Sequence, residues 1–205
     1  MALVCRRIAT IYSALVAGEE VPPAYFGSLR DLVELETAYA ASGDFQDDQT
    51  YWGRHLPPES GLDPWRRKAA IDRDAHAPSA PIRFDPAVVG QIKELSKKLR
   101  IRRYSVSTAA TALLARAWSG SGSEVALDFP VSRRVVAESK TLPAMLAGVV
   151  PLVLYASPEL TVGEFCRTVD ARLRELLQHQ RFPVHTLEGG GVGGRQASNR
   201  VAVNF

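Results

Sequence analysis

The sequence has few cysteines and no long apolar run. Only two cysteines occur in 205 residues, Cys5 and Cys166, and they lie far apart. A disulfide scaffold is therefore excluded, and a reducing compartment is expected. No apolar stretch approaches the ~20 residues that a membrane-spanning helix requires. We predict a cytoplasmic protein with no membrane partner.

The N-terminus needs separate consideration, because two arginines precede a short apolar run. Arg6 and Arg7 followed by residues 8–18 resemble the start of a signal peptide. However, Val4, Ile8 and Leu15 fall on one side of a helix, which favours an amphipathic helix over residues 2–17.

Most motifs for catalysis or ligand binding are also missing. The sequence has no Gly-Lys-Ser/Thr phosphate loop, no Gly-x-Ser-x-Gly elbow and no metal-ligand spacing. Gly189, Gly191 and Gly194 fit Gly-x-Gly-x-x-Gly, but no strand precedes them and no helix plainly follows, so we predict a loop. The net charge of +3 is too small to indicate nucleic-acid binding. We predict no bound metal and no nucleic-acid partner.

What is present is an α/β pattern. Two runs rich in branched apolar residues, 126–134 and 143–154, predict two strands of a buried sheet. Shorter strands are expected at 81–85 and 200–205. Helical periodicity and capping residues predict further elements, namely helices at 2–17, 28–42, 45–55, 86–99, from Ser105 or Ser107 to Gly120, and 162–178.

A stretch rich in Pro, Gly, Asp and Arg runs from residue 56 to residue 80. Such composition is typical of a boundary between structural units. We therefore predict two parts, residues 1–78 and residues 79–205.

Three groups of residues carry a family resemblance. Phe129-Pro130-Val131-Ser132-x-Arg134, followed by Met145 and by Pro151-Leu152, is similar to the middle of the condensation domain of nonribosomal peptide synthetases. His179-Gln180-x-x-Pro183 resembles a later motif of that family. An upstream helix signature is matched by Tyr39, Ser42, Asp48, Tyr51 and Trp52.

The resemblance implies a chloramphenicol acetyltransferase-like two-lobed sandwich, present in part as the tail of the N-lobe and most of the C-lobe. It implies amide-bond formation between acyl and aminoacyl thioesters held on carrier proteins, with no directly bound cofactor but with phosphopantetheine-tethered substrates. The family's His-His-x-x-x-Asp-Gly motif is absent from this sequence. We therefore expect the chain to be inactive alone. There are two alternatives. The first is an ester-forming acyltransferase of lipid or polyketide assembly, and the second is a non-catalytic remnant or binding module.

The resemblance also assigns candidate site residues. Ser132, Arg134, Met145 and Gly148 are expected to line the substrate tunnel. Arg134 has two interpretations: it pairs with a buried carboxylate or lines the donor tunnel, or it is a solvated loop charge. The family pattern has an asparagine where Gly148 stands, so a hydrogen-bonding amide is lost there.

The other candidates concern structure and partners. Tyr51, Trp52, His179, Gln180 and Pro183 are expected to serve structural roles, and no histidine is expected to be catalytic. Two partners are implied: a peptidyl or acyl carrier protein, and a neighbouring polypeptide that supplies the missing N-lobe. A basic run is interpreted either as a solvated helix end or as a docking patch for the acidic carrier protein. It comprises Lys97, Lys98, Arg100, Arg102 and Arg103.

Overall fold

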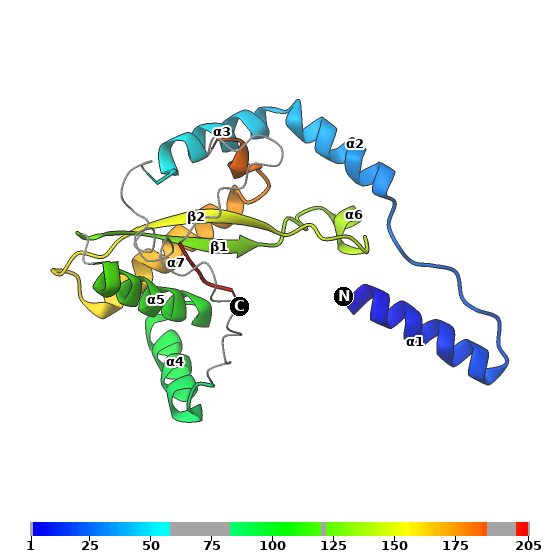
Figure 1. Cartoon of the computed structure of the whole chain (residues 1–205), viewed down its shortest axis with the longest axis horizontal. Coiled ribbons are helices and arrows are strands. Elements are labelled where there is room, and N and C mark those ends of the chain that lie inside the picture. Colours follow the sequence, from blue (N-terminus) through cyan, green and yellow to red (C-terminus); the bar gives the residue numbers. More distant parts are fainter. Residues whose placement is uncertain (1, 58–82, 120–121, 188–199, 205) are drawn as a thin grey trace, which may run out of the picture.

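The computed structural model describes residues 2–57, 83–119, 122–187 and 200–204. Within these ranges the chain has a small mixed sheet surrounded by helices (Figure 1). The sheet order is β2-β1-β3, where β1 is Glu124–Val131, β2 is Gly148–Tyr155 and β3 is Val201–Ala202. β1 pairs antiparallel with β2 and parallel with β3.

The register of the β1–β2 pair puts one apolar face of the sheet into the core. Leu127 lies opposite Leu152, and Phe129 lies opposite Val150. All four side chains are buried, since β-branched and large apolar residues on one face of a pleated pair pack together. The opposite face of β1 carries Asp128, whose carboxylate accepts a hydrogen bond from Arg200 Nε at 2.7 Å. This ion pair joins the start of β3 to the centre of the sheet.

Two long helices cover the apolar face. They are α5 (Arg103–Ser119) and α7 (Val162–Gln178), which contact each other and also contact β1 and β2, respectively. Helix α4 (Pro86–Leu99) packs on α5. Thr161 begins α7 with a capping box: its hydroxyl accepts from the Glu164 amide, and the Glu164 carboxylate accepts from the Thr161 amide. The hydrogen bonds from Thr161 lower the pKa of the Glu164 carboxyl.

The N-terminal helices form an arm that extends from this core (Figure 1). Helix α3 (Gly43–His55) is anchored by Trp52, which is 1% exposed and belongs to the same apolar cluster as the sheet. Helix α2 (Leu29–Ala40) continues the arm, and its N-cap Ser28 accepts from the Asp31 amide. Helix α1 (Ala2–Ala17) lies at the end of this arm, with its first turn beside the β1–β2 connection. A single turn of helix, α6 (Ala137–Lys140), interrupts the β1–β2 connection.

Much of the predicted secondary structure is confirmed, with differences at the ends of elements. The predicted helices at 2–17, 86–99 and 162–178 match α1, α4 and α7. The predicted strand at 81–85 is wrong for residues 83–85, which lie outside any strand; Asp85 instead caps α4 by accepting from the Ala87 amide. Helix α5 begins at Arg103, ahead of the predicted Ser105 or Ser107. Both hydroxyls instead donate hydrogen bonds: Ser105 to the Asp170 carboxylate at 2.7 Å, and Ser107 to the Arg103 carbonyl at 3.4 Å.

The two central strands are shorter than predicted. β1 ends at Val131 and β2 begins at Gly148, so residues 132–134 and 143–147, which were predicted as strand, belong to the connection. Of the strand predicted at 200–205, the described residues 200–204 form a strand only at Val201–Ala202, which is β3. Helix α3 begins two residues earlier than predicted because Ser42 caps it. Three features of the sequence lie outside the described residues: the predicted boundary at residues 78–79, the predicted loop at the glycines of residues 189–194, and one of the four histidines, His76.

Candidate functional site

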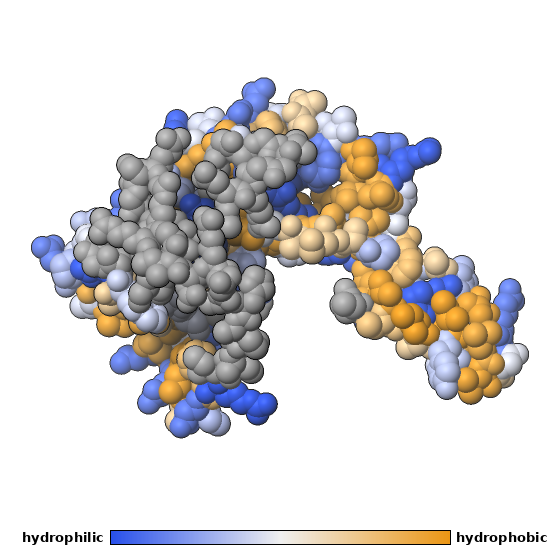
Figure 2. Space-filling model, viewed as in Figure 1, coloured by the Kyte–Doolittle hydropathy of each residue, from blue (hydrophilic) through white to orange (hydrophobic). Residues whose placement is uncertain are grey.

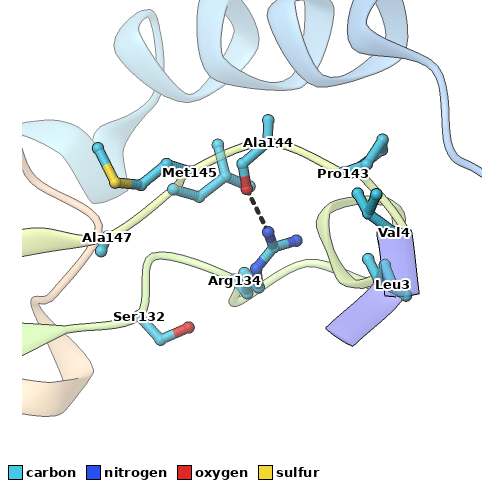
Figure 3. Close-up of a pocket in the computed structure, with 9 residues that line it drawn as sticks. Leu3, Val4, Ser132, Arg134, Pro143, Ala144, Met145 and Ala147 are labelled. Carbon is cyan, nitrogen blue, oxygen red and sulfur yellow. Dashed lines mark hydrogen bonds between the residues drawn. The ribbon is translucent and has the colours of Figure 1, made fainter. Parts of the chain in front are cut away.

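A pocket of about 390 Å³ lies at the end of the β1–β2 hairpin (Figure 3). Ser132 and Arg134 line it from the end of β1, and residues 143–147 line it from the segment before β2. Leu3 and Val4 of α1 close another side. The structure thus brings three of the predicted tunnel residues together, namely Ser132, Arg134 and Met145. The fourth, Gly148, lies just beyond the pocket at the start of β2.

The Arg134 guanidinium holds the segments of the hairpin connection together. It donates to the carbonyl oxygens of Ser139, Leu142 and Ala144, with the Leu142 contact at 3.0 Å. The last of these three bonds is visible in Figure 3. A planar cation with five donors suits a cluster of carbonyl groups at the end of a short helical turn. Arg134 therefore combines a place in the pocket wall with a structural contact that neither sequence interpretation contained.

Two further wall residues are accessible from solvent. Met145 is 91% exposed, whereas Leu142, three residues earlier in the same connection, is buried. Ser132 is exposed as well. An unbranched, flexible thioether adapts to apolar partners of varied shape, and a hydroxyl both donates and accepts. The pocket therefore offers an apolar rim beside one small polar group.

Arg133 points away from this pocket and lies against Gly148. Its Nη2 donates to the Phe182 carbonyl at 3.0 Å, whereas its Nε is buried without a hydrogen-bond partner. A Cβ added at Gly148 would come within 2.7 Å of that Nε. Burial lowers the pKa of the Arg133 guanidinium, and the nearby Glu36 and Tyr39 oppose this change. The space beside Gly148, where the family pattern has an asparagine side chain, is thus filled by arginine.

Residues of the His-Gln-x-x-Pro motif and of the upstream helix signature meet at a polar junction between α3 and the end of α7. Asp48, 8% exposed, accepts from the Tyr39 hydroxyl at 2.5 Å and lies 2.6 Å from His179 Nδ1. The His179 carbonyl accepts from Trp52 Nε1 at 2.9 Å. The His179 ring stacks on the Tyr51 ring, with the ring centroids 3.9 Å apart. Five side chains from two distant parts of the chain therefore form one connected network.

The electrostatics of this junction follow from burial and from the carboxylate. Burial and the hydrogen bond to Asp48 raise the pKa of Tyr39 far above its ordinary value. Burial also raises the pKa of Tyr51 to about 12. Arg181 lies over the Tyr39 ring, 4.1 Å from its centroid, and donates to the Leu35 carbonyl at 2.8 Å. Both tyrosines stay protonated at neutral pH, and Tyr39 is a fixed donor to Asp48.

The remaining motif residues fix the chain after α7. Gln180 Nε2 donates to the Leu177 carbonyl at 2.8 Å. Pro183 precedes a 3₁₀ turn at Val184–Thr186, and its carbonyl accepts from the Thr186 hydroxyl at 2.8 Å. Phe182, 1% exposed, packs against Phe45. This segment thus ties α7 to α3 through apolar as well as polar contacts.

None of the three histidines in the described part of the chain lines the pocket. His179 is held by Asp48 and Tyr51. His55 Nδ1 lies 2.7 Å from the Tyr51 carbonyl, and its ring packs on Tyr51. His185 is exposed on the 3₁₀ turn.

The basic run surrounds the α4–α5 corner. Lys97 pairs with Glu94 at 3.1 Å, and both side chains are mostly exposed. Arg100 ends α4 in the left-handed conformation, with φ of 56°. The Arg102 guanidinium donates to the Tyr104 hydroxyl, while its amide donates to Asp170. The run therefore presents exposed positive charge but also contains helix-capping contacts.

In the described ranges no group of His, Cys, Asp or Glu side chains is arranged to hold a metal ion. No helix in the same ranges has the length and apolar character needed to cross a membrane. Cys5 is exposed and Cys166 is buried, and both are free thiols.

Solved structures share this fold. The first condensation domain of the calcium-dependent antibiotic synthetase, in complex with a substrate analogue, is 28% identical with a TM-score of 0.73, and the match covers 94% of this chain and 45% of that one. The condensation enzyme VibH matches with a TM-score of 0.69 at 18% identity, over 93% of this chain and 45% of that one. The chain thus has part of the chloramphenicol acetyltransferase-like fold.

The sequence comparisons agree. The Condensation domain family matches residues 1–200, and the chain belongs to this family. An isonitrile lipopeptide synthase from Streptomyces coeruleorubidus is 28% identical over 100% of this chain and 14% of its own length. A dimodular nonribosomal peptide synthase from Bacillus subtilis is 24% identical over 88% of this chain and 8% of its own length. The chain spans less than half of each solved relative and about a tenth of these synthases.

Proposed function

We propose that the chain is a fragment of a nonribosomal peptide synthetase condensation domain and contributes to amide-bond formation between carrier-bound thioesters. In that reaction the acceptor amine attacks the thioester carbonyl, a C–N bond forms, and the phosphopantetheine thiol leaves. The observation that carries the proposal is the family match over residues 1–200, which includes the segments around the pocket.

The proposal gives the described residues a supporting role. The pocket of Ser132, Arg134 and Met145 forms part of a tunnel wall for the thioester arm, and Arg134 holds that wall in shape. The base is outside this chain, because the sequence lacks His-His-x-x-x-Asp-Gly and the described histidines lie away from the pocket. A general base must reach the proton that it removes. The chain alone therefore forms no amide.

The division into residues 1–78, from the N-lobe, and residues 79–205, from the C-lobe, belongs to this proposal. So do a cytoplasmic location and a neighbouring polypeptide that carries the rest of the N-lobe. The segments on either side of the boundary contact each other through the Asp48–His179 junction. Such a contact is what a joint between two lobes requires.

The test is an amide-forming assay with two carrier proteins, one loaded with an acyl thioester and one with an aminoacyl thioester, followed by mass spectrometry of the carriers. We expect no product with the purified chain alone. Product formation by the chain alone would refute the absence of a base. A parallel assay with a hydroxyl-bearing acceptor separates ester formation from amide formation.

Carrier docking on the basic run is tested by charge reversal. Lys98→Glu and Arg103→Glu alter exposed cations at the α4–α5 corner, and Arg54→Glu on α3 is a control of the same charge change. We expect the first two variants to weaken carrier binding in a salt-dependent manner, and the control to leave it unchanged. Equal binding by all three variants would remove the docking assignment without affecting the tunnel assignment.

A further inference from the structure

The pocket at the end of the β1–β2 hairpin has an apolar lining that contains one charged residue. Leu3, Val4 and each residue from 143 to 147 contribute apolar side chains. Figure 3 shows them together with the hydroxyl of Ser132 and the guanidinium of Arg134. Within the part of the chain that the structure describes, no Asp, Glu, Lys or His side chain lines the pocket. A bound group therefore meets apolar surface, one hydroxyl and one cation. Figure 2 shows the apolar surface around the start of α1.

The Arg134 guanidinium decides which charges the pocket accepts. It donates to the carbonyls of Ser139, Leu142 and Ala144. These acceptors are neutral, so the positive charge beside the pocket is not cancelled by them. A ligand ammonium group would be repelled by this cation, and it would lose water without meeting a carboxylate. A free amine is thus poorly matched to the pocket.

A neutral acyl group fits the same lining well. The volume of about 390 Å³ falls within the range of about 300–1,000 Å³ that is typical of small-molecule sites. The Met145 side chain, 91% exposed, is unbranched and adapts to aliphatic chains of different shape. The exposed Ser132 hydroxyl is able to donate to a neutral carbonyl.

We infer that the pocket binds an uncharged acyl group and discriminates against aminoacyl groups that carry a free ammonium. An aliphatic acyl chain and an N-acylated aminoacyl group both belong to the accepted class. The inference rests on the proposed function for the thioester character of the substrate, and it adds the class of acyl group. The discrimination arises from the Arg134 cation and from the absence of a carboxylate in the described lining.

The experiment measures binding of small thioesters of N-acetylcysteamine to the purified full chain. The 4-methylpentanoyl and leucyl thioesters have the same carbon skeleton and differ only in the α-amine. The glutaryl thioester carries a carboxylate instead. At about pH 6.5 an α-amine is protonated. The sequence has two methionines, Met1 and Met145. Carbon-13 labelling of their methyl groups gives an NMR signal at the pocket rim, which the Met145→Leu variant assigns.

We expect the Met145 signal to shift in a saturable manner with the 4-methylpentanoyl thioester. The leucyl thioester should bind at least about tenfold more weakly, because its ammonium group is desolvated beside a cation. Acetylation of the leucyl amine should restore binding to within about threefold of the 4-methylpentanoyl thioester, because the charge is removed. The glutaryl thioester should also bind more weakly than the 4-methylpentanoyl thioester.

Two matched variants locate the discrimination. Ala147→Asp puts a carboxylate into the lining, whereas Ala171→Asp puts the same group on an exposed position of α7 outside the pocket. Ala147→Asp should weaken binding of the 4-methylpentanoyl thioester and narrow or reverse its advantage over the leucyl thioester. Ala171→Asp should leave both affinities within about threefold of those of the parent chain.

The other outcomes overturn the inference. Equal binding of the 4-methylpentanoyl and leucyl thioesters, or absence of binding by all probes, removes the pocket as a selective acyl site. Tightest binding of the glutaryl thioester would show that Arg134 recognises an anion. Equal effects of the two aspartate variants would place the discrimination outside the pocket. Binding is measured without an acceptor amine, so amide formation by the chain alone would contradict the proposed function and leave the acyl preference intact.

Discussion

Replacing Asp48 by alanine should destabilise the protein by breaking the junction between α3 and the end of α7. The carboxylate is 8% exposed and interacts with both the Tyr39 hydroxyl and the His179 ring. A hydrogen bond to a charged group contributes about 1.5–3 kcal/mol, so the two bonds set an upper limit of about 6 kcal/mol. The His179 side chain is 24% exposed, and water will replace part of its interaction. We expect a loss of about 3 kcal/mol.

Urea denaturation followed by tryptophan fluorescence measures this loss. Trp52 is a suitable reporter because its indole donates to the His179 carbonyl inside the same junction. For a chain of about 200 residues, about 3 kcal/mol corresponds to a fall of about 6–12 °C in melting temperature. Asp47→Ala removes an exposed carboxylate one position earlier and should have almost no effect.

A double-mutant cycle tests the reasoning directly. If Asp48 and His179 stabilise the protein through each other, the combined variant Asp48→Ala with His179→Ala should cost clearly less than the sum of the two single variants. Strict additivity would refute the junction as a coupled network, even if each single variant is destabilised. An Asp48→Ala variant as stable as Asp47→Ala would refute it outright.

Two further predictions concern the Gly148 contact and the acid limb of stability. Gly148→Ala should lower stability by about 1–3 kcal/mol, because the new Cβ meets Arg133 Nε at 2.7 Å, and the cost should vanish in an Arg133→Ala background. Gly53→Ala is the control, since a Cβ there meets nothing within 4 Å, and an equal loss at both glycines in urea denaturation would contradict the steric explanation. Burial raises the pKa of Asp170, but hydrogen bonds from Ser105, Arg174 and the Arg102 amide outweigh it and lower the pKa overall. The stability that Asp170 contributes is therefore present above its unfolded pKa of about 3.9 and is lost as pH falls through the lower folded value. Urea midpoints between about pH 5 and 2 should fall less steeply in Asp170→Asn than in the parent chain, and equal slopes would contradict the assignment.

Local signals in the sequence predicted much of the helical structure. Asp85 followed by Pro86, and Thr161 followed by Glu164, are caps whose geometry involves residues two or three positions apart. Such contacts form wherever the helix forms, so a single sequence is sufficient to find them. The strand ends were less predictable, because residues 143–147 are also apolar but lie beyond the β1–β2 register, which ends at the Val131–Gly148 pair.

The candidate site could be predicted only in part, because its contacts join distant residues. Asp48 and His179 are 131 positions apart, and nothing in either motif alone indicates that the two side chains meet. The three carbonyl contacts of Arg134 depend on the path of the hairpin connection, which includes the short helix α6. Backbone acceptors carry no sequence signal, so an arginine that binds them looks like any other loop arginine.

The two adjacent arginines that follow β1 make contacts with different parts of the chain. Because successive side chains of an extended chain point to opposite faces, Arg133 and Arg134 leave the strand in different directions. Arg134 turns to the pocket and holds the hairpin connection, whereas Arg133 crosses Gly148 and donates to Phe182, which packs on α3 through Phe45. Arg133 therefore links the end of β1 to the segment that joins α7 to α3, while the adjacent Arg134 lines the pocket.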